Sequence, residues 1–155
     1  VFDQSLKRDF AIRMPKIAVL ALNPHAGDHG VNGEKKKKII MPAIKKAFEE
    51  NILAFGPFPS DGFFGMGEFN NYDGVLALYH DQGLIPMKME SFGMGVNITI
   101  GLPFIRSSVD HGTAFDIVGK NLANEGSLRE AVKIACEMAK IRKADKTNLY
   151  EKDYS

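Results

Sequence analysis

The chain has 155 residues, which is enough for one substantial hydrophobic core that buries roughly two-thirds of the unfolded surface. Its 20 basic and 19 acidic residues give a formal net charge of +1, so charge gives no reason to expect nucleic acid or an acidic membrane as partner. No stretch approaches the ~18 apolar residues of a membrane helix and no signal peptide is recognisable, so we expect a cytoplasmic protein that binds small molecules.

The first predicted elements form a strand, a loop and a helix. Residues 16–22 (KIAVLAL) are a nearly continuous apolar run with β-branched members, which is typical of a strand covered on both faces in a parallel sheet. Residues 23–32 contain Pro24 and several turn-forming residues, which predicts a loop. Apolar residues then recur at helical spacing over 33–50, which predicts a helix.

The same order repeats more loosely further along the chain. Strands are predicted over 52–56, 74–79 and 96–101, with a Pro- and Gly-rich loop as far as residue 71 and a short helical or irregular stretch as far as residue 91. Ser127 and Glu130 predict a capping box at the start of a helix over 127–142, in which Cys136 is expected to be a small buried residue. This alternation predicts an α/β fold with a mostly parallel sheet flanked by helices.

Histidines and carboxylates follow three of the predicted strands. His25, Asp61, His80 and Asp81 all come shortly after a strand, and ligands of open α/β sheets bind outside the carboxyl ends of the strands. Neutral imidazoles are good ligands for divalent transition metals, so we predict His25 and His80 as metal ligands. Asp61 and Asp81 are open between three roles: outer partners of an imidazole, additional ligands, or a general base. Each of the four side chains could instead make a structural hydrogen bond in its loop.

Basic and amide side chains lie in Gly-rich segments downstream. Lys88, Asn97 and Arg106 together could form a cradle for an anion, because Arg grips phosphate or carboxylate in bidentate fashion. Lys88 taken alone is equally consistent with a solvated surface residue. The glycine spacing matches neither the Walker nor the Rossmann fingerprint.

Residues 110–124 are rich in small side chains that would let a ligand approach the backbone. Asp116 within this segment is the residue type that usually binds ribose hydroxyls.

Several of these segments resemble known dehydrogenases. Residues 111–124 resemble the adenosine-binding loop of isocitrate and isopropylmalate dehydrogenases, which bind NAD without a G-x-G-x-x-G turn. LNPHAGD, YHDQGL, GVNITIGLPFIR and SVDHGTAFD together resemble more closely the C-terminal half of the 4-hydroxythreonine-4-phosphate dehydrogenase family of pyridoxal phosphate biosynthesis, from about residue 16 to residue 139. The resemblance implies an isocitrate/isopropylmalate dehydrogenase-like fold.

The resemblance also implies roles for individual residues. His25 and His80 would bind a divalent metal such as Zn, Co or Mg, and the catalytic candidates are Asp61, Asp81 and Lys88. The substrate would contact Lys88, Asn97 and Arg106. The NAD adenosine would be held by a further set, namely Gly112, Thr113, Ala114, Asp116 and Asn124. His111 leads that loop and would contact the cofactor rather than the metal.

The family also uses residues that this chain lacks, namely an earlier metal-binding histidine and a His-Thr pair that contacts the substrate. The chain starts at Val1, so we expect it to be the C-terminal portion of a two-domain enzyme and not active alone. Its expected parts are a metal-, substrate- and NAD-binding domain at about 16–126, a C-terminal helix at 127–142 and a tail at 143–155. The family further implies a homodimer that shares its site between subunits.

The implied reaction is metal-assisted oxidation by NAD and decarboxylation of 4-phosphooxy-L-threonine to 3-amino-2-oxopropyl phosphate. One alternative is a paralogous dehydrogenase for threonate or erythronate 4-phosphate. Alternatives of another class are a metal-dependent hydrolase or lyase and a non-catalytic phosphate-binding module.

Overall fold

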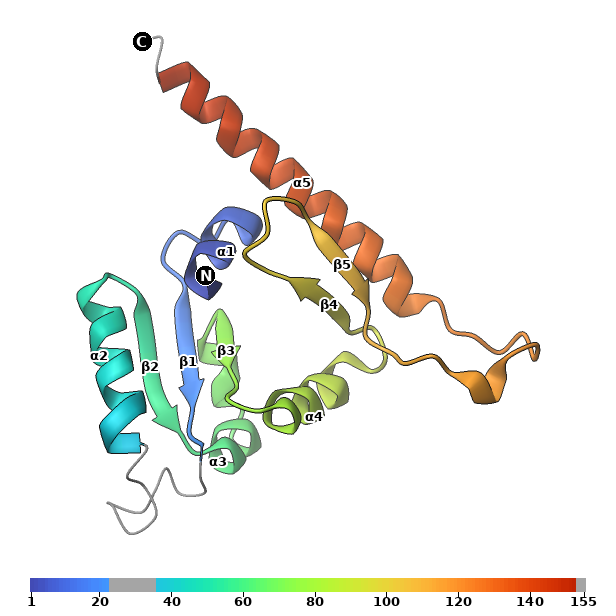
Figure 1. The fold of residues 1–155 in the computed structure, drawn as a ribbon, viewed down its shortest axis with the longest axis horizontal. Helices are drawn as coiled ribbons and strands as arrows, with labels where there is room; N and C mark the ends of the chain where they lie inside the picture. Colours follow the sequence, from blue (N-terminus) through green and yellow to red (C-terminus); the bar gives the residue numbers. More distant parts are fainter. Residues whose placement is uncertain (23–35, 153–155) are drawn as a thin grey trace. The chain divides into compact units, whose positions relative to one another are not determined.

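The computed structural model describes residues 1–22 and 36–152, which form two compact units (Figure 1). One unit, Ile12–Pro86, contains a parallel sheet and is called the sheet unit below. The other combines Val1–Ala11 with Met87–Ser155, contains two antiparallel strands and is called the hairpin unit. Helix α4 (His80–Ser91) begins in the sheet unit and ends in the hairpin unit.

The sheet unit confirms the predicted fold class. Strands β1 (Lys16–Leu20), β2 (Leu53–Phe58) and β3 (Gly74–Leu76) are arranged in the order β2-β1-β3. Strand β1 pairs in parallel with both of its neighbours. The three strands lie where strands were predicted, although β1 and β3 end earlier than the apolar runs that indicated them.

Both faces of β1 are covered, which explains its unbroken apolar sequence. Val19 packs on one face against Ile40 and Ala54, together with side chains from helix α2 (Met41–Glu49). Ala18 and Leu20 are fully buried on the other face. That second layer is largely aromatic, with Val75 and Ala77 beside five rings, namely Phe58, Phe63, Phe64, Phe69 and Tyr72. Successive strand residues alternate between faces, so one short strand supplies both halves of the core.

The helices of this unit agree only in part with the prediction. Within the predicted helix 33–50, a π-helical turn (Lys36–Ile40) leads into α2. The loop predicted as far as residue 71 contains α3 (Ser60–Gly65) and a 3₁₀ helix (Glu68–Asn71), so that prediction was wrong. These two helices carry phenylalanines into the aromatic layer, and the burial of the rings outweighs the poor helix propensity of the glycines.

Gly56 is required by the packing of β2 on β1. Its φ is 131°, and a β-carbon at this position would overlap the carbonyl oxygen of Val19. The close approach coincides with a shift in the β1–β2 register between Ala18 and Leu20. Any larger residue would therefore force the two strands apart.

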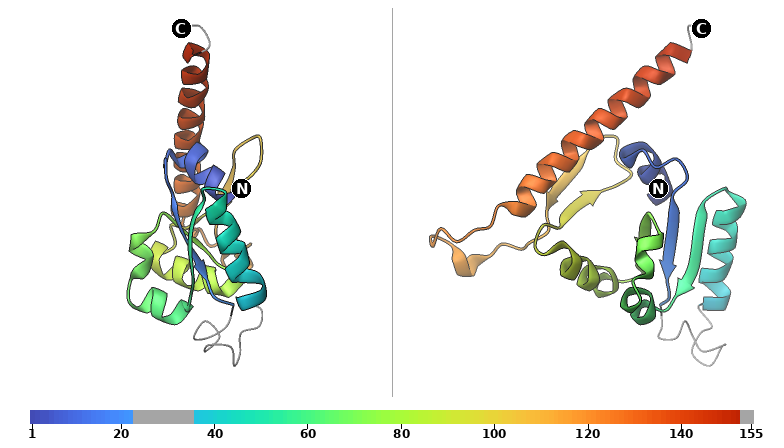
Figure 2. Two further views of the ribbon diagram at one scale, coloured as in Figure 1. Left: turned by 90° about the vertical axis from the view of Figure 1, so that its left-hand side faces the viewer. Right: turned by 180° about the vertical axis from the view of Figure 1, so that it is seen from behind.

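The hairpin unit is built on helix α5 (Gly126–Lys152), with strands β4 (Val96–Thr99) and β5 (Arg106–Val109) alongside it (Figure 2). Helix α1 (Phe2–Phe10) also packs on α5. The predicted strand 96–101 and helix 127–142 are confirmed, and the helix continues to Lys152. Strand β5 was not predicted, because the sequence RSSV lacks a clear apolar period, and α1 was missed although Phe2, Leu6 and Phe10 recur at helical spacing.

Two details of α5 differ from the prediction. Ser127 and Glu130 form no capping box, because Ser127 bonds to other segments and Glu130 pairs with Lys133 at 3.6 Å. Cys136 is exposed rather than buried. Across residues 1–22 and 36–152, none of the helices has both the length and the apolar character needed to cross a bilayer.

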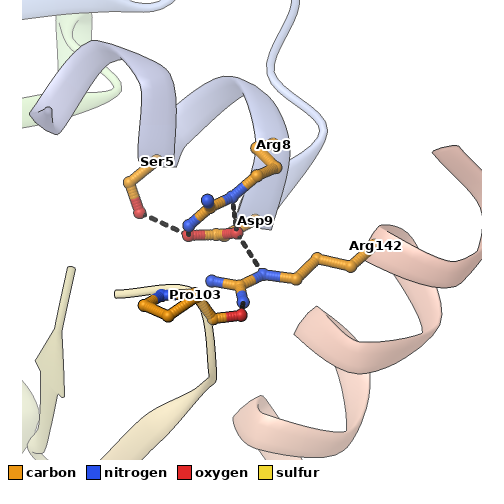
Figure 3. Close-up of polar contacts among 5 residues, drawn as sticks. All are labelled: Ser5, Arg8, Asp9, Pro103 and Arg142. Carbon is orange, nitrogen blue, oxygen red and sulfur yellow. Dashed lines mark hydrogen bonds and ion pairs between the residues drawn. The ribbon is translucent and has the colours of Figure 1, made fainter. Parts of the chain in front are cut away.

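A buried carboxylate connects α1 to α5 (Figure 3). Asp9 is fully buried and accepts hydrogen bonds from Arg8 Nε at 2.8 Å, from Arg142 Nε at 2.7 Å and from the Ser5 hydroxyl at 2.7 Å. Arg142 also donates through Nη1 to the Pro103 carbonyl at 3.3 Å. One arginine on α5 thus holds both α1 and the loop between β4 and β5.

Burial raises the pKa of Asp9, but the hydrogen bonds from Arg8, Arg142 and Ser5 lower it by more, so the pKa lies well below its ordinary value of 3.8. The carboxylate is therefore more stable in the folded chain than in the unfolded chain. Above the ordinary pKa this difference stabilises the fold in full, and the contribution is lost as the pH falls below that value.

Replacement of Arg142 by alanine should lower the free energy of unfolding by roughly 1.5–3 kcal/mol, the usual contribution of a hydrogen bond to a charged group. Urea unfolding followed by circular dichroism measures the change. Arg129→Ala is the matched control, because Arg129 lies on the same helix and pairs with Glu125 in an exposed position, where ion pairs contribute little. Equal losses in the two variants would contradict the role given to Asp9.

The stability difference between the native protein and Asp9→Asn should shrink as the pH is lowered from about 6 to about 3. Over this range Asp9 takes up a proton in the unfolded chain while it stays ionised in the folded chain, which favours the unfolded state of the native protein alone. Urea unfolding at a series of pH values gives both curves. A difference that stays constant over this range would show that the pKa of Asp9 is not depressed by folding.

Candidate functional site

The carboxyl ends of the three parallel strands gather polar residues at one edge of the sheet unit. Ala21 follows β1, Ser60 begins α3 after β2, and His80 begins α4 after β3. Because β1 is parallel to both neighbours, these three strand ends face the same edge. This is the edge at which the sequence predicted a ligand site.

His80 and Asp81 form a hydrogen-bonded pair at this edge. The His80 Nδ1 atom lies 2.7 Å from Asp81 Oδ1, and the two side chains are 77% and 72% exposed. An ionised carboxylate can only accept, so Nδ1 carries the proton and donates it to Asp81. In the neutral ring Nε2 then keeps its lone pair, which is the form of histidine that binds metals with a carboxylate behind it.

The other predicted residues of this edge are less fully defined. Asp61 lies in the first turn of α3 with its side chain exposed. His25, the second predicted metal ligand, lies outside the described residues. Among the residues that the structure does describe, no three His, Cys, Asp or Glu side chains come together in a group that could hold a metal ion.

Gln82 is a central residue of this edge that was not predicted from the sequence. Its side chain is 6% exposed, and its Oε1 accepts a hydrogen bond from the Leu78 N–H at 2.7 Å. Its Nε2 donates to the Ala21 carbonyl at 2.5 Å and to the Ser60 hydroxyl at 2.7 Å. One buried amide thus joins the segments that follow all three strands. The only sequence signal was its place between His80-Asp81 and Gly83, immediately after a strand.

The predicted substrate-binding residues lie in the hairpin unit. The Lys88 ammonium is 3.3 Å from the Asp110 carboxylate, and it also donates to the Asp110 carbonyl at 3.3 Å. Asn97 on β4 and Arg106 on β5 are both exposed. In the antiparallel register Asn97 is opposite Ser108 and Thr99 is opposite Arg106, so the four residues share one face of the hairpin.

The opposite face of the hairpin is directed toward α5. Ser107 on that face donates from its hydroxyl to the Ala131 carbonyl at 2.9 Å. Arg106 is oriented along its own face, because Nη1 donates to the Thr99 hydroxyl at 2.7 Å. This bond leaves other guanidinium N–H groups of Arg106 for an anion.

The segment predicted to bind NAD forms the connection from β5 to α5. Gly112 and Thr113 are exposed, Ala114 has a left-handed backbone with φ 49°, and Asp116 lies in a short 3₁₀ helix (Phe115–Ile117). His111 donates from Nδ1 to the Gly112 carbonyl at 3.0 Å, since a carbonyl can only accept. The Oδ1 atom of Asn124 accepts from the Gly126 N–H at 2.8 Å and so caps the start of α5.

Ser127 anchors this connection to the hairpin. Its buried hydroxyl donates to the Gly95 carbonyl at 2.6 Å and accepts from the Asp110 N–H at 3.1 Å. The residue before β4 and the residue after β5 are therefore held by one side chain in the first turn of α5. The serine that suggested a helix cap from sequence thus makes tertiary contacts.

Comparisons with known proteins agree with these observations. Residues 1–135 match the family model described as "Pyridoxal phosphate biosynthetic protein PdxA". A 4-hydroxythreonine-4-phosphate dehydrogenase from Bacteroides thetaiotaomicron is 48% identical over 99% of this chain, and the match spans 43% of that relative. The chain thus spans less than half the length of this curated relative.

Two solved structures show the same fold. The crystal structure of 4-hydroxythreonine-4-phosphate dehydrogenase from Klebsiella pneumoniae has a TM-score of 0.75 and 41% identity, covering 89% of this chain and 42% of the other. A terephthalate 1,2-cis-dihydrodiol dehydrogenase from Burkholderia xenovorans has a TM-score of 0.66 and 31% identity, covering 86% of this chain and 42% of the other.

Ser127→Ala should lower the free energy of unfolding by roughly 1–3 kcal/mol, because it leaves the buried Gly95 carbonyl and the partly buried Asp110 N–H without this partner. It should also speed amide hydrogen exchange in residues 111–124. Ser107→Ala is the graded control, since it removes a single hydrogen bond to a carbonyl of the same helix. If the two variants lose equal stability and exchange alike in this segment, Ser127 is not its anchor.

Proposed function

The chain belongs to the PdxA family of pyridoxal phosphate biosynthetic proteins, and on that premise we propose that the protein is a 4-hydroxythreonine-4-phosphate dehydrogenase. Its reaction would be the oxidation of 4-phosphooxy-L-threonine by NAD and its decarboxylation to 3-amino-2-oxopropyl phosphate. The observation that carries the proposal is the hydrogen-bonded His80–Asp81 pair at the carboxyl edge of the parallel sheet, in which Asp81 binds Nδ1 of His80 and a neutral ring would offer Nε2 to a metal.

The described residues supply one donor of the kind that a divalent metal prefers. A neutral imidazole backed by a carboxylate is a common metal ligand, and His80 with Asp81 provides one. We propose His80 and His25 as ligands of a divalent ion such as Zn, Co or Mg. An ion held by these residues would supply stabilisation of negative charge on the substrate oxygen, and NAD would serve as hydride acceptor.

The chain's own side chains would bind and orient the substrate. Arg106 offers N–H groups that Thr99 leaves free, which suits a phosphate, and Asn97 lies on the same face of the hairpin. Lys88 is held by Asp110 and would add a second positive charge for the substrate. Asp61, Asp81 and Lys88 are the candidates to accept the proton of the substrate hydroxyl.

The connection between β5 and α5 would hold the adenosine of NAD. Gly112, Thr113 and Ala114 leave the backbone open to a ligand, and Asp116 has the chemistry to bind ribose hydroxyls. Asn124 would contribute through the turn that it caps, and His111 would contact the same cofactor. In the domain arrangement that we propose, residues of about 16–126 act on metal, substrate and NAD, in a cytoplasmic homodimer that shares its site between subunits.

A second candidate is a paralogous dehydrogenase for threonate or erythronate 4-phosphate. It is favoured by one finding, namely that a protein named for a different substrate, a dihydrodiol, shares this fold with 31% identity. The fold therefore accommodates more than one substrate, and phosphate-binding residues such as Arg106 would serve any of these phosphorylated acids.

The full-length protein with zinc or cobalt and NAD should form NADH from 4-phosphooxy-L-threonine faster than from threonate or erythronate 4-phosphate. His80→Ala should reduce kcat/KM by at least about 100-fold, because the substitution removes the proposed metal ligand and leaves Asp81 without its imidazole partner. Lys45→Ala, an exposed change on α2, serves as the control.

Absorbance of NADH measures all of these rates. Preference for one of the non-aminated acids would replace the first proposal by the paralogue. Turnover without any NADH would instead indicate a hydrolase or lyase, and binding of phosphorylated ligands without turnover would indicate a binding module.

A further inference from the structure

We infer that Gln82 is a positioning residue that sets the place of His80 and Asp81, an inference that rests on the function proposed above. The Gln82 side chain is 6% exposed, and it directly follows these two exposed residues in the first turn of α4. Because the Gln82 side chain is buried, it cannot contact a substrate that enters from solvent. Its effect on the site must therefore pass through the backbone segments that it holds.

Both N–H donors and the carbonyl oxygen of the Gln82 amide take part in these contacts. A glutamine amide has two N–H donors, and here one reaches the Ala21 carbonyl and the other the Ser60 hydroxyl. Its carbonyl oxygen accepts from the Leu78 N–H, which resembles the back-reaching half of a capping box at the start of α4. Only an amide side chain of this length can make all three bonds at once.

The bonded atoms lie next to the functional groups in sequence. Leu78 comes two residues before His80, and Ser60 comes directly before Asp61. The His80 and Asp81 side chains are mostly exposed, so neighbouring side chains do little to fix them. The positions of His80 and Asp81 therefore depend on the position of the first turn of α4. Gln82 fixes this turn by hydrogen bonds to Ala21, after β1, and to Ser60, after β2.

Substitutions can separate this role from a general contribution to stability. Gln82→Met keeps the unbranched shape and removes all three hydrogen bonds. Gln82→Glu keeps the acceptor for Leu78 but sets a carboxylate against the Ala21 carbonyl, so it should have an intermediate effect. Ile44→Ala is the matched control, because it weakens the core packing of α2 without touching the strand ends.

The test uses cobalt(II) titrations of the full-length protein, followed by the visible absorption of the bound ion. Gln82→Met should weaken cobalt binding roughly 10- to 100-fold and change the absorption bands, as loss of outer partners does at other metal sites. Ile44→Ala should leave the affinity and the bands unchanged.

A second measurement is made on the metal-free protein. Long-range ¹H–¹⁵N NMR should show His80 in the single tautomer with the proton on Nδ1 in the native protein, and a mixture of tautomers in Gln82→Met. A merely structural role for Gln82 would not move this signal in a variant that is still folded.

The outcomes separate the two proposals. If His80→Ala leaves cobalt binding unchanged, the proposed metal site is wrong, whatever Gln82 does. If His80→Ala abolishes binding but Gln82→Met keeps the native affinity, absorption and tautomer, the inference about Gln82 is wrong. Should Gln82→Met fail to fold, Gln82→Glu decides the matter by the same measurements, with native values overturning the inference and intermediate values supporting it.

Discussion

The parallel pairing of β1 with both β2 and β3 is the constraint on which the candidate site depends. It directs three strand ends to one edge of the sheet, although the residues there are far apart in sequence. Backbone segments that leave a sheet at its edge would be free to diverge, and the buried amide of Gln82 prevents this by bonding to all three. The site therefore combines a topological requirement with a single buried polar contact, and the polar groups that face solvent, His80 and Asp81, add little to its stability.

Sequence patterns predicted the sheet unit well where burial dictates the spacing of apolar residues. The continuous apolar run of β1 indicated a strand covered on both faces, and it is packed between α2 and a layer of aromatic rings. The expectation that ligands bind beyond the carboxyl ends of the strands drew attention to Asp61, which follows β2, and to His80 and Asp81, which follow β3. Gln82 could not be found in the same way, because its importance comes from burial and from partners 22 and 61 residues away, which a local pattern does not report.

The hairpin unit was harder to predict for a related reason. Its stability rests on polar groups that are satisfied by distant residues: Asp9 by Arg142, and the Ser127 hydroxyl by Gly95 and Asp110. Such groups look like ordinary surface or capping residues in sequence, so the buried contact of Asp9 was missed and Ser127 was assigned the wrong role. The predicted substrate residues Asn97 and Arg106 do share one face of the hairpin, which the sequence alone could not establish because β5 carries no strand pattern.

The most direct test of the central claim, that His80 is a metal ligand, is anomalous X-ray scattering at the zinc edge from crystals of the full-length protein grown with zinc. We predict an anomalous peak about 2.1 Å from Nε2 of His80, with Asp81 still bonded to Nδ1. Zinc bound only at other positions, with Nε2 of His80 unoccupied, would contradict the claim.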